Sequence, residues 1–241
     1  MAEVQVQRRL RIALFSTGDE VAGPGAPLRP GQLYDANRPM LAALLRRAGC
    51  QVSDLGIVPD RREAMREALS RAAGEHELVL TSGGVSTGEE DHVRSALNET
   101  GALTFWRIGI KPGRPVAMGV VGGSAFMGLP GNPVAAFVTF AFLGRALVAR
   151  LSGQRFTPPT PVTVMAAFSY RKKEGRREYV RVRLERNPDG MVFAQKHPRE
   201  GAGVITSLTE THGLAELPEE LTELAAGDRL GFLPYAALIG T

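Results

Sequence analysis

The N-terminal two thirds of the chain alternate between short apolar runs and amphipathic segments. Residues 10–16 (LRIALFS) and 78–82 (LVLTS) are nearly continuous apolar runs, typical of strands buried on both faces of a parallel sheet, and residues 51–58 read as a further strand. Apolar residues at helical spacing follow a candidate cap at Asn37, and a second such pattern follows a capping-box-like start at Asp60. Three strands alternating with two helices predict an open α/β sheet with right-handed crossovers.

Shorter strands and one long apolar helix are predicted next. Residues 105–110 and 116–121 are strand-like and flank the turn KPGRP, and a hairpin is expected at the two glycines 122–123. The segment 133–151 is apolar nearly all round until its last two turns and begins with proline, which suits a first helical position after Asn132 as the cap. This helix is therefore expected to be buried.

The character of the sequence changes at residues 153–161 (GQRFTPPTP). Three prolines in four positions resist both a helix and a central strand, so we predict a domain boundary here, with domains 1–153 and 154–241. Residues 179–184 alternate between apolar and basic side chains, as a strand does. Further strand-like segments lie near Met165, Val192, Val204 and Leu230, which together predict a small all-β domain.

Composition and charge exclude several classes of protein. Among the 241 residues, 29 are Lys or Arg and 25 are Asp or Glu, and the excess is spread as 17 against 14 over residues 1–153 and 12 against 11 beyond. A nucleic-acid-binding face is therefore not expected, and the basic run RKKEGRRE (171–178) is interpreted as a solvated hairpin. Glycines and prolines divide the charge-free stretch 115–144, which argues against a membrane span. The lone Cys50 permits no intrachain disulfide and no Cys-based zinc cluster, so we expect a cytoplasmic protein without a membrane segment.

The segment TSGGVSTGEEDH (81–92) carries the most chemistry. Its glycines allow a ligand to approach the backbone closely, and successive amides with neighbouring hydroxyls form a nest for phosphate or another oxyanion. The loop follows a predicted strand, and the carboxyl ends of parallel strands are where such folds bind ligands. The alternative is a solvated loop whose acidic residues favour the first turn of the next helix.

Two other loops supply charge of opposite sign. STGDE (16–20) follows the first strand, so Asp19 and Asp91 are candidates to hold one Mg²⁺, which takes one or two carboxylates plus substrate phosphates. In KPGRP, Lys111 offers a point charge and Arg114 a planar fork, and both suit an oxyanion. The alternatives are ordinary loop acids and a polar hairpin turn.

Taken together, five co-linear motifs resemble the molybdopterin molybdenumtransferase family, which includes the E domain of gephyrin. The motifs are FSTGDE, DANRPML (35–41), TSGGVSTGEEDH, IKPGRP and GLPGNPV (128–134), and the resemblance covers essentially the whole chain. It implies a molybdopterin-binding α/β domain followed by a barrel-like β domain. It also implies a transferase that consumes adenylated molybdopterin and molybdate and releases molybdenum cofactor and AMP with a divalent cation.

The resemblance also carries expectations about partners and site residues. Family members have two further domains before the first strand seen here and act as homodimers, so we expect this chain to be a C-terminal part that is weakly active alone; other cofactor-biosynthesis proteins are expected partners. Alternatives are a molybdopterin adenylyltransferase, or a molybdopterin-binding scaffold module. Arg114 stands where the family usually has a second Lys. The resemblance places Mg²⁺ and catalysis at Asp19 and Asp91, and substrate binding at Thr17, Gly18, Ser82, Gly83, Gly84, Val85, Ser86, Gly88, Lys111, Arg114, Pro130, Gly131 and Asn132.

Overall fold

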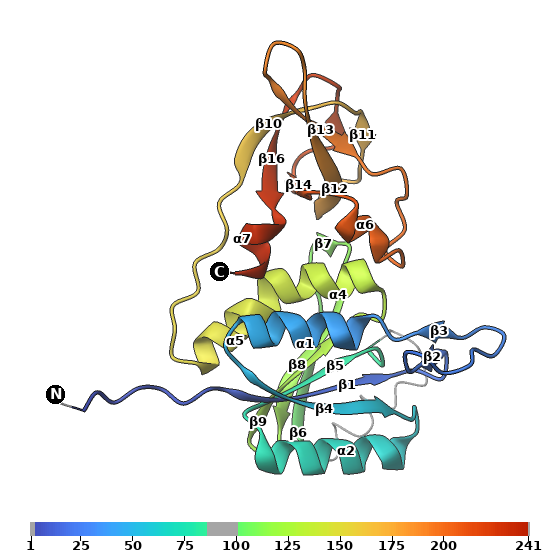
Figure 1. The fold of residues 1–241 in the computed structure, drawn as a ribbon, viewed down its shortest axis with the longest axis vertical. Helices are drawn as coiled ribbons and strands as arrows, with labels where there is room; N and C mark the ends of the chain where they lie inside the picture. The colour runs from blue at the N-terminus through green and yellow to red at the C-terminus, as the bar shows by residue number, and fades with distance from the viewer. Residues whose placement is uncertain (1–2, 86–100, 241) are drawn as a thin grey trace.

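The computed structural model describes residues 3–85 and 101–240, and its first part is a mixed sheet that is mostly parallel (Figure 1). The strands β4, β1, β5 and β9 run parallel to one another, and β8 and β6 extend the sheet in antiparallel fashion. The carboxyl ends of four neighbouring strands therefore lie at one edge. In sheet order the strands are β4 (Gln51–Val58), β1 (Arg11–Thr17), β5 (Leu78–Ser82), β9 (Ser124–Leu129), β8 (Pro115–Val121) and β6 (Gly101–Arg107).

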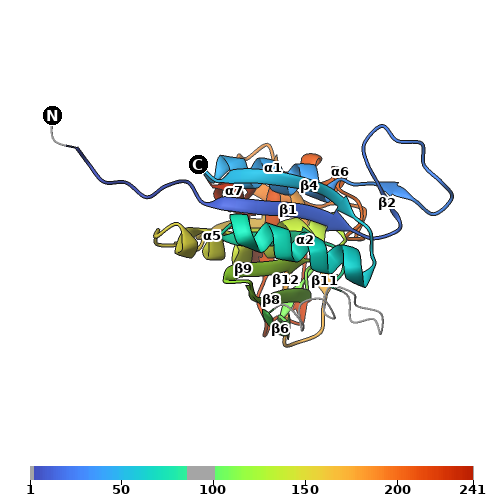
Figure 2. The same ribbon diagram turned by 90° about the horizontal axis from the view of Figure 1, so that it is seen from below.

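Helices cover both faces of this sheet because its central strands are apolar on both sides. In β1, Ile12 and Leu14 pack in one core, whereas Ala13 and Phe15 pack in the other. Helix α1 (Asn37–Arg47) and the helix after β9 cover the first face, and α2 (Arg62–Glu75) covers the second (Figures 1 and 2). The predicted α/β architecture, a mostly parallel sheet with helices on both faces, is confirmed.

The long apolar helix of residues 133–151 is divided into α4 (Pro133–Thr139), a π-helical turn η1 (Phe140–Gly144) and α5 (Arg145–Leu151). By length and composition it could cross a membrane, yet more than half of its most apolar window is buried within the protein. It shares a core with Leu214 and Leu233 of the second part of the chain. Its apolar character is thus explained by packing between two sheets.

The second part of the chain is a closed sheet of five strands, as the resemblance implied. The ring closes because β13 pairs with both β10 and β12. In order around the ring, the strands are β10 (Val162–Ala166), β16 (Arg229–Pro234), β14 (Gly213–Leu217), β12 (Arg177–Arg186) and β13 (Val192–Lys196). The short elements are β2 (Val21–Ala22), β3 (Leu33–Tyr34), β7 (Ile110–Lys111), β11 (Tyr170–Arg171), β15 (Glu223–Leu224), α6 (Thr206–Thr209) and α7 (Tyr235–Ile239).

The predicted helix caps at the first two helices are wrong. Ala36 precedes α1 and Arg61 precedes α2, and neither of these two residues makes a side-chain cap hydrogen bond; in the first turn of α1, the N–H of Arg38 is instead bonded to Asp35 Oδ1 at 3.1 Å. Asn37 is the first residue of α1, and its side chain is directed to other loops. The prediction for the third helix is better, because Asn132 and the first-position Pro133 do lie at its start, although Asn132 makes no side-chain cap bond.

Three strand predictions also need correction. Residues 105–110 are not one strand, because β6 ends at Arg107 and β7 leaves to pair in parallel with β12 of the second sheet. Val204 lies in irregular backbone before α6. The basic run 171–178 is not a hairpin, since β11 pairs with β15 and not with β12.

The two parts of the chain are tied together at several points besides their shared core. Strand β7 belongs by sequence to the first part and by hydrogen bonding to the second sheet. The guanidinium group of Arg145 donates hydrogen bonds to the carbonyl oxygens of Ala237 and Leu238 in α7, at 2.9 and 2.8 Å. The division into domains at residues 153 and 154 stays a prediction.

One surface ion-pair cluster gives a pH-dependent prediction. Hydrogen bonds from the side chain of Arg11, and to a smaller extent from that of Arg8, lower the pKa of Glu77 to about 2. A lowered pKa contributes stability above the unfolded-state pKa of about 4.3, and this contribution is lost as the pH falls through 2. Because both arginines are well exposed, we expect Glu77→Gln to cost only about 1 kcal/mol at pH 7.

Urea denaturation between pH 7 and pH 2 checks this expectation. The stability difference between wild type and Glu77→Gln should close as the pH falls from 4.5 to 2. Glu67→Gln, at an exposed position on α2, serves as the control and should show a small, constant difference. A Glu77→Gln difference that stays constant down to pH 2 would contradict the assignment.

Candidate functional site

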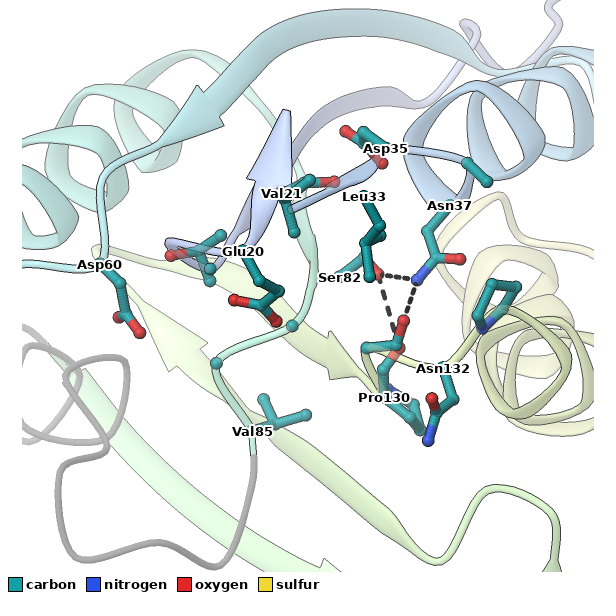
Figure 3. Close-up of a pocket in the computed structure, with 18 of the residues that line it drawn as sticks. Glu20, Val21, Leu33, Asp35, Asn37, Asp60, Ser82, Val85, Pro130 and Asn132 are labelled. Carbon is teal, nitrogen blue, oxygen red and sulfur yellow. Dashed lines mark hydrogen bonds between the residues drawn. The ribbon is translucent and has the colours of Figure 1, made fainter. Parts of the chain in front are cut away.

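A cavity of about 450 Å³ lies at the carboxyl ends of β1, β5 and β9 (Figure 3). It occupies the edge of the parallel sheet at which open α/β folds bind ligands. We call it the first cavity. Its walls are Ser16, Thr17, Gly18, Glu20, Val21, Leu33, Tyr34, Asp35, Ala36, Asn37, Asp60, Ser82, Gly83, Gly84, Val85, Pro115, Pro130, Gly131, Asn132 and Pro133.

The glycine after β5 allows two of the cavity loops to touch. Gly83 has φ +90°, and a Cβ atom built on it would lie 2.3 Å from the carbonyl oxygen of Thr17. Its own N–H donates to the carbonyl oxygen of Leu129 at 3.1 Å. Only glycine combines this backbone conformation with so close an approach. Gly83 therefore sets the shape of the cavity floor.

Several buried polar atoms at this floor have no partner within the described part of the chain. They are the hydroxyl oxygens of Ser16 and Thr17, each in a residue 2% exposed, and the Oδ1 atom of Asn37. Buried polar groups in folded proteins are nearly always hydrogen-bonded, so such a group of unpartnered atoms at a cavity wall calls for a ligand or ordered water. This is the most direct sign of binding in the first cavity.

The charged residues that line the first cavity are all acidic. They are Glu20, Asp35 and Asp60, with no Lys or Arg among the lining residues. Asp35 is engaged in an ion pair with Arg38 at 2.9 Å and accepts the Arg38 N–H at 3.1 Å. Within residues 3–85 and 101–240, no cluster of three or more His, Cys, Asp or Glu side chains is arranged to hold a metal ion by itself.

The structure brings together most of the sequence-predicted residues near this cavity, but not all. Asp19 is exposed and is not part of the wall, whereas its neighbour Glu20 is. Ser86, Gly88 and Asp91 lie outside the described residues, so the Asp19–Asp91 metal site stays a prediction. Those that do line the cavity are Thr17, Gly18, Ser82, Gly83, Gly84, Val85, Pro130, Gly131 and Asn132.

Several polar residues of the wall were not among the residues predicted from the sequence, namely Ser16, Glu20, Tyr34, Asp35, Asn37 and Asp60. Glu20 was part of a motif that had already been singled out. Asp60 follows the end of β4, so the strand-end rule that selected the other loops also applied to it. Asn37 was taken for a helix cap. Position at the end of a strand therefore pointed to the loops after β1, β4 and β5, but only the loops after β1 and β5 were selected.

A second cavity, of about 390 Å³, lies between β7 and the barrel. Four cationic side chains and two carboxylates line it, which leaves it positive by about two charges. The charged lining residues are Lys111, Arg181, Lys196, Arg199, Glu178 and Glu200, and the remaining wall includes Tyr170, Tyr179, His197, Gly201 and Ala202.

Lys111 is held at the second cavity by a buried carboxylate. Its Nζ atom lies 3.0 Å from Glu178 Oε2, and Glu178, which is 2% exposed, also accepts a hydrogen bond from the Tyr170 hydroxyl at 2.9 Å. Partial burial opposes the charge on Lys111, but the hydrogen bond to Glu178 together with the charge interactions and hydrogen bond with Tyr170 and the attraction of Glu178 outweigh it and raise the pKa of Lys111. The lysine is therefore cationic at neutral pH.

Arg181 anchors the loop that borders this cavity. Its guanidinium group donates to the carbonyl oxygens of Arg199, Glu200 and Gly201 and to Ser207 Oγ, all at 2.8–2.9 Å. Arg181 is 7% exposed, and burial lowers its pKa, but a guanidinium group stays protonated at neutral pH.

The loop 199–202, which Arg181 anchors, also forms a wall between the two cavities. The carbonyl oxygen of Ala202 accepts a hydrogen bond from the N–H of Val134 at 3.0 Å, at the start of α4. Ala202 lines the second cavity, and the adjacent turn 130–133 lines the first. The two cavities are therefore neighbours that share the contact between these two segments.

The expectation that all three loops meet at one site needs correction. The loops after β1 and β5 meet at the first cavity, and the KPGRP turn contributes Pro115 to it. Lys111 instead lines the second cavity, because β7 is drawn into the second sheet. Arg114 is exposed and lines neither cavity.

The fold and these cavities define an α/β ligand-binding domain with its site at the edge of a parallel sheet, joined to a closed β-barrel. Residues 13–150 match the family described as probable molybdopterin binding domain, and residues 163–235 match the MoeA C-terminal region, domain IV. The chain belongs to the molybdopterin molybdenumtransferase family.

Individual relatives agree with this assignment. The chain is 36% identical over its whole length to a protein of Haemophilus influenzae named molybdopterin molybdenumtransferase, and covers 60% of it. It is 33% identical over 238 residues to molybdopterin molybdenumtransferase 2 of Mycobacterium tuberculosis, covering 95% of this chain and 58% of that one. The solved structure of a molybdopterin biosynthesis MoeA protein from Pyrococcus horikoshii superimposes with a TM-score of 0.78 at 27% identity, covering 95% of this chain and 55% of the other. The chain thus spans little more than half the length of these relatives.

Proposed function

We propose that this chain takes part in molybdenum cofactor biosynthesis as the substrate-binding part of a molybdopterin molybdenumtransferase. The reaction inserts molybdenum from molybdate into adenylated molybdopterin and releases AMP. The single observation that carries the proposal is the pair of adjoining cavities, one acidic and lined by unpartnered buried polar atoms, the other basic. Two substrates of different chemistry have to meet in this reaction, and the two cavities offer each its own surroundings.

The first cavity suits the adenylated molybdopterin. Its volume of about 450 Å³ is in the range of small-molecule sites. The glycines after β5 let a phosphate approach the backbone closely, and the unpartnered hydroxyls of Ser16 and Thr17 are donors for its oxygens. We therefore assign the adenylyl phosphate to the loop that begins at Ser82.

The acidic side chains of the first cavity fit a divalent cation. Mg²⁺ is usually held by one or two carboxylates together with substrate phosphates, and the carboxylates of Glu20 and Asp60 line the cavity. These two, with Asp19 and Asp91, are the residues that would hold it. When bound, the cation supplies charge neutralisation for the phosphoanhydride that breaks.

The second cavity suits molybdate. Lys111 presents a charged ammonium group that is oriented by Glu178, and Arg181 adds a buried positive charge without a carboxylate partner of its own among the described residues. A tetrahedral oxyanion next to Lys111 lies one loop away from the first cavity. Proximity of this kind is a large part of catalysis by positioning.

The alternatives find less support. A molybdopterin adenylyltransferase would not need the barrel that forms one wall of the basic cavity. For a scaffold module, no observation favours a peptide-binding surface. A cytoplasmic location, a homodimer and association with other cofactor-biosynthesis proteins are proposed from the family alone.

Calorimetric titration tests the proposed function. The chain should bind AMP in the presence of Mg²⁺, and it should bind molybdate. Replacing Lys111 and Arg114 together by Ala should weaken molybdate binding about tenfold or more, since a charge-assisted hydrogen bond contributes roughly 1.5–3 kcal/mol.

The single variants separate the two residues. The structure places Lys111 at a cavity and Arg114 on the surface, so Lys111→Ala should account for most of the loss and Arg114→Ala for little of it. Molybdate affinity that is unchanged in the double variant would remove the second cavity from the proposal.

A further inference from the structure

The side chain of Asn37 connects two loops that line the first cavity. Its Nδ2 atom lies 2.7 Å from Ser82 Oγ and 2.7 Å from the carbonyl oxygen of Gly131 (Figure 3). The residue is only 7% exposed. Both hydrogens of the side-chain amide are therefore used within the protein.

The partners of Asn37 fix which way its amide is turned. A carbonyl oxygen such as that of Gly131 can only accept, so the atom facing it must be the nitrogen. The Ser82 hydroxyl directs its own hydrogen toward the carbonyl oxygen of Pro130, at 3.4 Å, and accepts from Asn37. The amide oxygen of Asn37 is left buried and without a donor in the described residues.

This connection begins where the sheet ends. The pairing of β5 with β9 runs up to Ser82 and Leu129, and one further backbone bond joins Gly83 to Leu129. Beyond it, no further backbone hydrogen bond joins the described loop 83–85 to the turn 130–132. Asn37 is held in place as the first residue of α1, a helix packed in the core of the sheet. Its side chain therefore sets the separation of the two loops from a rigid support.

We propose that Asn37 is a positioning residue that fixes the width of the first cavity between the loop 82–85 and the turn 130–132. The identity of the ligand, an adenylate group, rests on the proposed function, whereas the connection between the loops does not. Aspartate has the same shape as asparagine but no donor for the Gly131 carbonyl. The proposal therefore requires the amide and not merely a polar side chain of this size.

The test is AMP binding with Mg²⁺, measured by calorimetry on the full chain, combined with amide hydrogen exchange. Asn37→Ala and Asn37→Asp should each weaken AMP binding about tenfold, as expected for the loss of buried hydrogen bonds. Ser82→Ala should weaken it less, and the double variant Asn37→Ala with Ser82→Ala should match Asn37→Ala within about twofold, because the two side chains act as a unit. Exchange of the amides in residues 131–134 should be faster in both Asn37 variants.

Asn187→Ala is the matched control. Asn187 lies in the turn between β12 and β13, where its Oδ1 accepts the Met191 N–H at 2.8 Å, so the same substitution removes local hydrogen bonds far along the barrel. It should leave AMP affinity and exchange in 131–134 unchanged.

The outcomes separate this inference from the proposed function. AMP binding by Asn37→Asp or Asn37→Ala equal to wild type, or effects of Asn37 and Ser82 that simply add, would overturn the positioning role. If Asn37→Ala does not fold, the isosteric Asn37→Asp decides. A wild-type chain that does not bind AMP overturns the proposed function, and exchange in 131–134 then decides the role of Asn37: unchanged exchange in the variants overturns it.

Discussion

Replacing Gly83 by Ala should destabilise the protein by about 2–4 kcal/mol and weaken AMP binding at least about tenfold. Two effects add at this position. The backbone has φ +90°, which costs a residue with a Cβ atom about 1–2 kcal/mol, and the new Cβ would lie 2.3 Å from the carbonyl oxygen of Thr17. The atom that the new Cβ would meet is a backbone oxygen of Thr17, which cannot turn aside as a side chain can. The loop after β5 must therefore move away from β1. That movement opens the floor of the first cavity.

Gly190→Ala separates the two effects. Gly190 has φ +82°, close to that of Gly83, but a Cβ atom there has nothing within 4 Å. This control should therefore cost only about 1 kcal/mol and leave AMP affinity unchanged. Urea denaturation and calorimetry on both variants give the comparison. Equal effects of the two substitutions on AMP binding would show that the contact between Gly83 and Thr17 is unimportant to the cavity.

Replacing Arg181 by Met should have a comparably large effect, centred on the second cavity. The substitution leaves the carbonyl oxygens of the 199–201 segment and the Ser207 hydroxyl without their donor, and hydrogen bonds to charged groups contribute about 1.5–3 kcal/mol each. We expect a loss of about 3 kcal/mol in stability, equivalent to a fall in Tm of roughly 10 °C. Molybdate affinity should fall at least about tenfold, and more than AMP affinity, because Arg181 lines only the second cavity.

Arg183→Met is the control for this substitution. Arg183 lies two residues further along β12, is exposed, and makes one long hydrogen bond, 3.4 Å, to the carbonyl oxygen of Glu210. In thermal unfolding and molybdate titration, the Tm and the molybdate affinity of Arg183→Met should be close to those of the wild type. A molybdate affinity that falls equally in the two variants would point to general electrostatic attraction and not to a built site.

The sequence predicted the fold well where hydrophobic patterns are continuous. A continuous apolar run such as 78–82 is shielded from water only when other elements pack on both faces of its sheet. The parallel sheet and its covering helices could therefore be predicted from the pattern. The closed barrel was implied by resemblance only, because alternating strands do not reveal how β13 pairs with two neighbours. Strand β7 was missed for a related reason: two residues that pair with a distant strand leave no periodic signal.

The candidate site was predicted in part. Strand-end position correctly selected the loops after β1 and β5, whose glycines now line one cavity. Charge and the family resemblance placed Lys111 in the same site, whereas the pairing of β7 with β12 carries it to the second cavity. Asn37 illustrates the limit best. An asparagine before an apolar periodic segment favours a helix cap, and only the three-dimensional arrangement shows that its amide is used by Ser82 and Gly131 instead.

The proposed function requires an adenylate group and molybdate to occupy neighbouring cavities separated by the contact of Val134 with Ala202. The most direct measurement is a crystal structure of this chain with AMP, Mg²⁺ and molybdate, with an anomalous difference map recorded at the molybdenum absorption edge. We expect the AMP phosphate against the loop that starts at Ser82 and a molybdenum peak beside Lys111 in the second cavity. A molybdenum peak within the first cavity, or AMP bound away from the loop at Ser82, would contradict the proposed function.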